Sequence, residues 1–193
     1  MRVCAYVILA VGSVSWFAPL LLHRRKSATA PKLDRRARWG LLLVGVGYSL
    51  PWYTKYWRRT PEAWRLGVAV VCFAAATALS WAAAQALGRH WRIEAGLNTD
   101  HELVEHGIYS FVRHPIYTSM FLVVVGTNLI LGPLYLLPAS VLLYVVGTAI
   151  RVRYEETLLA ERFGEKFWEY RRAVGTYLPK LGHPNWASDK PRP

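Results

Sequence analysis

The chain has 193 residues, of which 53% are hydrophobic and 19% are charged, and its formal net charge is +12. Most charges stand between long apolar runs, which is typical of an integral membrane protein and not of a soluble globular domain. Because the lysines and arginines flank these runs and form no separate basic, aromatic-interleaved surface, the pattern argues against nucleic-acid binding. Cys4 and Cys72 fall within apolar runs and give neither a disulfide framework nor a metal-ligand spacing.

Three apolar runs occupy the N-terminal part of the chain, at residues 3–22, 39–57 and 66–87. The first is long enough to cross a hydrocarbon core of roughly 30 Å, and it exceeds the usual core of a cleaved signal peptide, which is the competing interpretation. The second is interrupted by Pro51 and ends in tryptophans and tyrosines, residues that favour the lipid headgroup level. The third is rich in alanine, which permits close helix packing.

Two further apolar runs, at residues 116–131 and 134–150, are separated only by Gly132-Pro133. So short a connection predicts an antiparallel hairpin of two membrane helices. Between residues 159 and 174, apolar side chains recur at three- and four-residue spacing, which predicts an amphipathic helix at the membrane surface. The fold class is therefore all-α, a polytopic integral membrane protein with about five transmembrane helices.

The lysines and arginines also predict an orientation. With five spans, nineteen of them lie on the side that holds residues 23–38, 88–115 and 151–193, against five on the other side. The positive-inside rule places the richer side in the cytoplasm. We expect an inner, cytoplasmic membrane with the polar segments facing the cytoplasm.

Two polar clusters bracket the hairpin. Residues 107–117 combine a glycine, two tyrosines, an arginine, a histidine and a proline, and residues 151–156 hold two arginines, a tyrosine and two glutamates. Since the hairpin returns the chain to the same side, both clusters are expected at one cytoplasmic mouth. Arginine offers a planar fork for a carboxylate, glutamates can hold an ammonium or sugar hydroxyls, and tyrosine rings can accept a sulfonium. Together these groups suit a zwitterionic cofactor better than a metal ion.

An ordered set of motifs then carries a family resemblance: LVEHGIY at 103–109, VRHPIY at 112–117, Arg151 with Glu155 and Glu156, Phe163-Gly164, and Trp168 with Tyr170. In this order they resemble the C-terminal half of the isoprenylcysteine carboxyl methyltransferase family, and the related membrane phospholipid methyltransferases share much of the pattern. The resemblance covers residues 86–179, and Arg89-His90-Trp91-Arg92 is similar to the segment that opens the family's shared region. Two positions differ, because Ser119 stands where the family usually has glycine and Ile108 where it often has proline.

The resemblance implies an enzyme that uses S-adenosylmethionine, held in a cytoplasmic pocket under the C-terminal amphipathic helix. It implies a lipophilic small-molecule or lipidated acceptor that enters from the bilayer, with membrane lipids as the surroundings. We expect a division into N-terminal spans with a basic loop at 1–88, a catalytic region at 89–181 and a disordered tail at 182–193. The cofactor-binding residues it implies are His106, Gly107, Tyr109, His114, Pro115, Tyr117, Glu155 and Glu156. The catalytic residues it implies are Arg113, Arg151 and Glu156.

Several alternatives stay open at this point. A carboxylate acceptor needs no base at neutral pH, whereas an amine acceptor, as in phospholipid N-methylation, would need one such as His114, Glu155 or Glu156. A membrane NADPH-dependent reductase of the sterol type is usually much longer than this chain. In a non-catalytic membrane protein, Arg151 with Glu155 would be an ordinary i,i+4 surface pair. Zinc is disfavoured because His101 and His106 are five residues apart and not four.

Overall fold

The computed structural model describes residues 1–22, 35–88 and 103–180. Most of the basic loop at 23–38, the start of the polar segment with Arg89-His90-Trp91-Arg92 and His101, and the tail at 182–193 lie outside the described residues. The described segments are helical. In chain order they are α1 (Arg2–Leu22), α2 (Arg35–Tyr53), η1 (Lys55–Arg58), α3 (Ala63–Leu87), η3 (Gly107–Ser110), α4 (Pro115–Leu131), η4 (Leu134–Leu136), α5 (Leu137–Phe163) and α6 (Glu165–Ala173).

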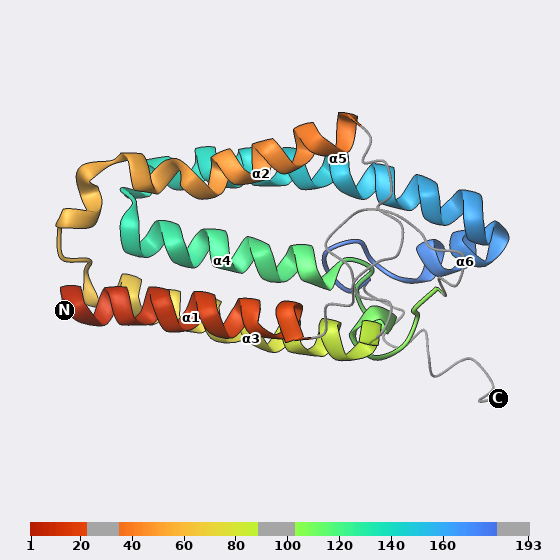
Figure 1. The fold of residues 1–193 in the computed structure, drawn as a ribbon, viewed down its shortest axis with the longest axis horizontal. Helices are drawn as coiled ribbons and strands as arrows, with labels where there is room; N and C mark the ends of the chain where they lie inside the picture. Colours follow the sequence, from red (N-terminus) through yellow and green to blue (C-terminus); the bar gives the residue numbers. More distant parts are fainter. Residues whose placement is uncertain (23–34, 89–102, 181–193) are drawn as a thin grey trace.

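The long helices form an elongated bundle in which α4 is central (Figure 1). Helices α2 and α5 lie together on one side of α4, and α1 and α3 lie together on the other. The short elements η3 and α6 gather at one end, which we call the site end. The N-terminus and η1 lie at the opposite end, which we call the far end.

The boundaries differ from the expected runs in two places. Helix α2 contains Pro51 and stops at Tyr53, so the aromatic residues after it belong to the separate turn η1. Helix α5 continues well past the apolar run to Phe163, and Gly164, with φ +55°, starts α6 in a new direction. The apolar spacing between 159 and 174 is therefore shared by the last turns of α5 and by α6, because a positive φ at Gly164 ends a right-handed helix.

Three of the helices are long and apolar enough to cross a membrane: Arg2–Leu22, Ala63–Leu87 and the segment Leu134–Phe163. Helix α4 is apolar but shorter. Valines, leucines and aromatic residues are exposed along the outside of the bundle, which only a lipid environment would solvate favourably. The protein is an integral membrane protein, as the sequence predicts, and the hairpin after Gly132-Pro133 is present as α4, η4 and α5.

Small residues bring the helices close together. A methyl group at Gly147 of α5 would lie 2.6 Å from the carbonyl oxygen of Gly40 on α2, so the two backbones touch where both residues lack a side chain. On the other side of α4, the ring of Phe73 fills the space left by Gly12 of α1 and Gly126 of α4. Contacts of this kind provide the dispersion energy that holds helices together where water supplies no driving force.

A buried arginine fastens the far end. Arg65, in the first turn of α3, is 1% exposed, and its Nη2 donates to the carbonyls of Asn128 and Gly132 at the C-terminus of α4. Its Nη1 donates to the Tyr56 hydroxyl at 3.1 Å and lies 3.6 Å from the Glu62 carboxylate. The cation thus satisfies carbonyls that the helix leaves unpaired and complements the negative end of its dipole.

Changing Gly147 to Ala should destabilise the bundle by about 1–3 kcal/mol, because the added methyl group meets backbone atoms that cannot move aside independently. The apparent melting temperature in detergent measures the effect. Gly45→Ala on α2 is the matched control, since nothing lies within 4 Å of the position its methyl group would take. An equal loss of stability in both variants would show that the close approach of α2 and α5 does not contribute to the stability of the bundle.

Candidate functional site

The predicted site residues cluster around the entry to α4. Pro115 is the first residue of α4, where proline fits because its missing N–H would have no partner in the helix. The strand-like residues just before it pair with the chain after α6: Arg113 N–H donates to the Gly175 carbonyl at 2.8 Å, and His114 N–H to the Thr176 carbonyl at 3.0 Å. The C-terminal segment is in this way fixed against the start of α4.

Arg113 and Glu156 form the buried centre of the site. The Arg113 side chain donates from Nε and Nη2 to Glu156 Oε1, at 3.0 and 2.8 Å. Its remaining N–H groups go to the carbonyls of Arg171 and Val174 and to the Thr176 hydroxyl. All five guanidinium donors are therefore used within the protein. Arg113 joins α4, α5 and the segment after α6.

His114 links the two glutamates. Its Nε2 lies 3.3 Å from Glu156 Oε1, and its Nδ1 lies 3.7 Å from Glu155 Oε2. Arg171 of α6 approaches the other oxygen of Glu156 at 3.2 Å. Glu156 is thus surrounded by two arginines and the imidazole. All three partners come from other elements than α5.

A second polar group consists of Tyr117, Arg151 and Glu155. Arg151 Nε donates to the Tyr117 hydroxyl at 2.8 Å, and Nη2 lies 3.4 Å from Glu155 Oε1, which also accepts a hydrogen bond from Tyr117. The Tyr117 carbonyl in turn accepts a hydrogen bond from Tyr144 of α5. Unlike Arg113, Arg151 keeps three N–H groups for which the described residues provide no hydrogen bond.

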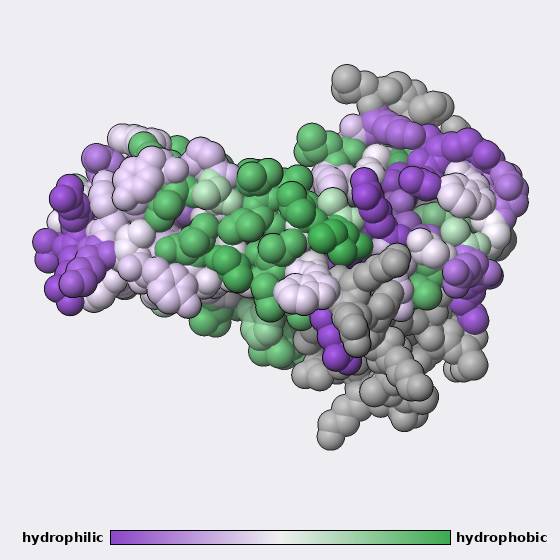
Figure 2. Space-filling model, turned by 90° about the horizontal axis from the view of Figure 1, so that it is seen from above, coloured by the Kyte–Doolittle hydropathy of each residue, from purple (hydrophilic) through white to green (hydrophobic). Residues whose placement is uncertain are grey.

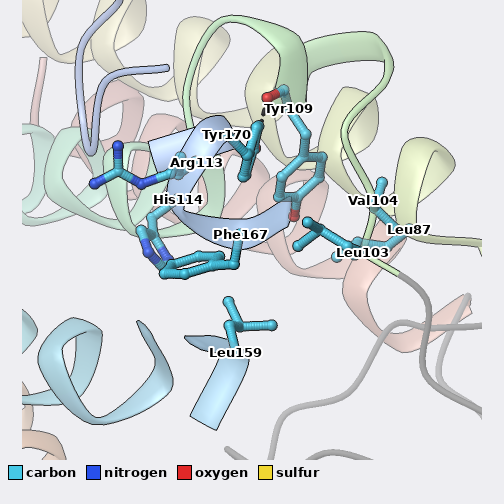
Figure 3. Close-up of a pocket in the computed structure, with 9 residues that line it drawn as sticks. All are labelled: Leu87, Leu103, Val104, Tyr109, Arg113, His114, Leu159, Phe167 and Tyr170. Carbon is cyan, nitrogen blue, oxygen red and sulfur yellow. Dashed lines mark hydrogen bonds between the residues drawn. The ribbon is translucent and has the colours of Figure 1, made fainter. Parts of the chain in front are cut away.

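A cavity adjoins these groups. Its empty volume is about 430 Å³, including the open mouth, and its lining residues are Leu87, Leu103, Val104, Tyr109, Arg113, His114, Leu159, Phe167 and Tyr170. Figure 3 shows the rings of His114 and Phe167 side by side, with Leu159 below them and Tyr109, Leu103 and Val104 across from them. The Arg113 guanidinium points away from the other lining side chains, in agreement with its internal hydrogen bonds.

Burial keeps the tyrosines of this cavity neutral. Burial raises the pKa of Tyr109 well above its ordinary value, and the neighbouring Tyr170 and Glu155 raise it further. Burial likewise raises the pKa of Tyr170, whose hydroxyl donates to the Tyr109 carbonyl at 2.6 Å. This hydrogen bond attaches α6 to η3 and closes one side of the cavity.

The structure thus brings most of the predicted site residues together, but in two different surroundings. Tyr109, Arg113 and His114 line the cavity, whereas Tyr117, Arg151 and Glu155 form the adjoining polar group. His106 is exposed, and Gly107, with φ +61°, faces Ala86 of α3. Sequence reasoning did not propose Leu159, Phe167 and Tyr170 as lining residues, although their spacing marked them as one apolar face.

The comparisons with known proteins agree with this arrangement. The sequence profile of the family described as phospholipid methyltransferase matches residues 64–166, which is more than half of the chain. The chain belongs to the phospholipid methyltransferase family. Curated proteins similar to this chain are named protein-S-isoprenylcysteine O-methyltransferase. They confirm the resemblance to the isoprenylcysteine carboxyl methyltransferase family that the sequence motifs indicate.

Three of these relatives show how far the similarity extends. The protein of Tribolium castaneum is 34% identical over 87 residues, which are 45% of this chain and 31% of the relative. The protein of Saccharomyces cerevisiae is 36% identical over 85 residues, 42% of this chain and 34% of the relative. The protein of Dictyostelium discoideum is 26% identical over 147 residues, 73% of this chain and 60% of the relative. The matches therefore span less than two thirds of these relatives.

A solved structure extends the comparison to most of the chain. The structure of the eukaryotic intramembrane Ras methyltransferase, an isoprenylcysteine carboxyl methyltransferase, has a TM-score of 0.58 to this chain at 23% identity. The match covers 89% of this chain and 63% of that one. The likeness shows a common fold, and it covers more of the chain than the family profile does.

Replacing Arg113 with Lys should weaken the structure more than replacing Arg151 with Lys. Lysine cannot reproduce the five-donor fork, so carbonyls of the C-terminal segment and part of Glu156 lose their partners, at a cost of about 3 kcal/mol. The apparent melting temperature and the rate of proteolysis near residues 174–180 measure the difference. Equal effects of the two variants would contradict the structural role of Arg113.

The Tyr170 phenol should make stability depend on alkaline pH. Because burial raises its pKa in the folded state, folding favours the protonated form, so stability is constant below about pH 10 and falls as the pH rises beyond it. In the Tyr170→Phe variant, the melting temperature measured from about pH 8 to 11 should fall less steeply with pH than in the unchanged protein. The same variant should lose about 1 kcal/mol at neutral pH with its hydrogen bond. An unchanged alkaline slope would show that Tyr170 does not contribute.

Proposed function

We propose that this chain is an integral membrane methyltransferase that uses S-adenosylmethionine and acts on a lipophilic acceptor, in a reaction most like isoprenylcysteine carboxyl O-methylation. The observation that carries the proposal is the cavity beside the two linked glutamates, most of whose lining residues lie within the segment that matches the family profile. The names of those relatives supply the acceptor class. A cofactor pocket at this cavity, under α6, is part of the same proposal.

The residues present fit the proposed cofactor. The cavity opens to the outside between η3, α5 and α6, so its fit to a cofactor rests on its lining. Its aromatic and aliphatic lining suits a purine ring, while Glu155, with a 22% exposed side chain, can accept hydrogen bonds from an ammonium or from ribose hydroxyls. Tyr109, His114, Pro115, Tyr117, Glu155 and Glu156 would hold the cofactor, which when bound supplies an electrophilic methyl group.

Arg151 is the stronger candidate for the acceptor. Its free N–H groups can bind a carboxylate and orient it, whereas Arg113 has no donor left among the contacts described above. Such a carboxylate is already ionised at neutral pH, so the protein needs only to position it and exclude water. Of the residues named as catalytic, we therefore propose Arg151 for orientation, and Arg113 and Glu156 for holding the surrounding elements in place.

A second candidate is N-methylation of a phospholipid amine, which the description of the matching family favours. An amine must lose a proton before it attacks, and His114 lies between two carboxylates where it could accept one. Product chemistry separates the two candidates. A methyl ester formed on a farnesylcysteine derivative is released by mild alkali, whereas a methyl group on the amine of phosphatidylethanolamine is not.

The number of membrane spans and their orientation are part of the same proposal. We propose five spans, with α2 and α4 crossing beside the three longest helices, and the site end in the cytoplasm of an inner membrane, as the count of lysines and arginines predicts. The division at residue 88 is proposed as a functional boundary only, since α3 packs directly on α4 through Phe73 and Gly126.

Filling the cavity tests the proposal. Leu159→Trp adds bulk where Leu159 lines the cavity, and calorimetry of the detergent-purified protein should show at least tenfold weaker binding of S-adenosylhomocysteine. Thr157→Trp places the same ring on an exposed position of α5 and is the control, with binding equal to that of the unchanged protein. Absence of saturable binding by the unchanged, folded protein would overturn the proposed function.

A further inference from the structure

The far end of the bundle carries a cluster of exposed cations that the proposed function does not use. Arg2, Lys55, Arg58 and Arg59 make up this far-end cluster. In the described segments that form this end, residues 1–6, 51–66 and 128–137, the one acidic residue is Glu62, which lies beside the buried Arg65. Figure 2 shows hydrophilic residues gathered at this end, next to the apolar midsection of the bundle.

A shallow hollow lies within the cluster. It is an open surface depression, with Arg2 and Arg59 among its polar lining residues and Ile130 and Leu131 of α4 among the apolar ones. The Tyr6 hydroxyl, another part of the wall, donates to the Trp57 carbonyl at 3.0 Å and so ties α1 to η1. The hollow combines cationic groups and an apolar surface at the junction of three elements.

The two arginines of the hollow have capacity for an anion. Arg2 donates from Nε to the Thr60 hydroxyl at 3.2 Å, and the Arg59 guanidinium lies 5.5 Å from the centre of the Tyr56 ring. Within the described residues, neither guanidinium has an ion-pair partner. A phosphate diester offers two free oxygens, which arginine forks can bind.

The surroundings of the hollow indicate a lipid. Large aromatic residues are exposed at this end, including Trp52, Tyr53 and Trp64, and such residues favour the headgroup level of a bilayer. On α1, Val3 and Val7 are 74% and 53% exposed directly beside the cations, where acyl chains can lie along the helix. A soluble anion or an acidic peptide would leave this apolar face uncovered.

We propose that the far-end cluster binds one anionic phospholipid, with the phosphate between Arg2 and Arg59 and the acyl chains along the exposed face of α1. The lipid is not the methyl acceptor, because the hollow and the cavity lie at opposite ends of the bundle. It joins the N-terminal helix to η1, at the end where Arg65 also fastens α4.

Native mass spectrometry of the full chain, released from nanodiscs of equal phosphatidylglycerol and phosphatidylcholine, tests the proposal. The unchanged protein should retain one phosphatidylglycerol in clear excess over phosphatidylcholine. Arg2→Gln combined with Arg59→Gln should reduce this retained fraction about fivefold or more. Arg59→Gln alone should reduce it partly, and it keeps the hydrogen bond of Arg2 to Thr60.

The control removes the same charge at the site end. Arg153→Gln combined with Arg162→Gln changes two exposed arginines of α5 and should leave phosphatidylglycerol retention unchanged. Added phosphatidylglycerol should also raise the melting temperature of the unchanged protein and of this control, but not that of the far-end variant. Equal retention of the two lipids, or an equal loss in both double variants, would overturn the proposal.

Discussion

The buried pair of Arg113 and Glu156 is the interaction on which the site end depends. A charged side chain at this depth is costly unless its hydrogen bonds are satisfied, and Arg113 satisfies all five donors with a carboxylate, two carbonyls and a hydroxyl. These acceptors come from α5 and from the chain around and after α6, which the sequence places 43 to 63 residues away. The pair therefore assembles the elements that enclose the cavity.

Hydrophobic patterning in the sequence was sufficient to predict the helical scaffold. Runs of apolar residues, small residues for close packing and the Gly132-Pro133 break predict an all-helical membrane protein with a final hairpin, because each signal is local in the chain. The ends of the helices were harder to place. Helix α5 extends to Phe163 because its charged turns are stabilised by partners from α6 and from the residues just before α4. Such partners cannot be recognised in the periodicity of α5 itself.

The sequence predicts which residues belong to the site but not which partners their side chains contact. The motif order identified Arg113, His114, Arg151 and Glu156 as a group, yet two arginines that look equivalent in the sequence have different surroundings. All five guanidinium N–H groups of Arg113 have hydrogen-bond partners within the protein, whereas three N–H groups of Arg151 have none among the described residues. Distinguishing them requires the positions of the backbone carbonyls after α6, which depend on the pairing of residues 175–176 with residues 113–114, and no local pattern in the sequence predicts this pairing.

Helix α4 is held by an arginine at each of its ends, Arg65 at its C-terminus and Arg113 immediately before its N-terminus. A helix held in this way cannot slide along its axis without breaking buried hydrogen bonds of a charged side chain at one end or the other. Gly164 is different, since nothing lies within 4 Å of the position a side chain would take there and its backbone already departs from the helix. Any movement of α6 about Gly164 would break the hydrogen bonds of Arg113 to the Arg171 and Val174 carbonyls and of Tyr170 to the Tyr109 carbonyl, so the cavity stays closed on that side for as long as the buried centre is intact.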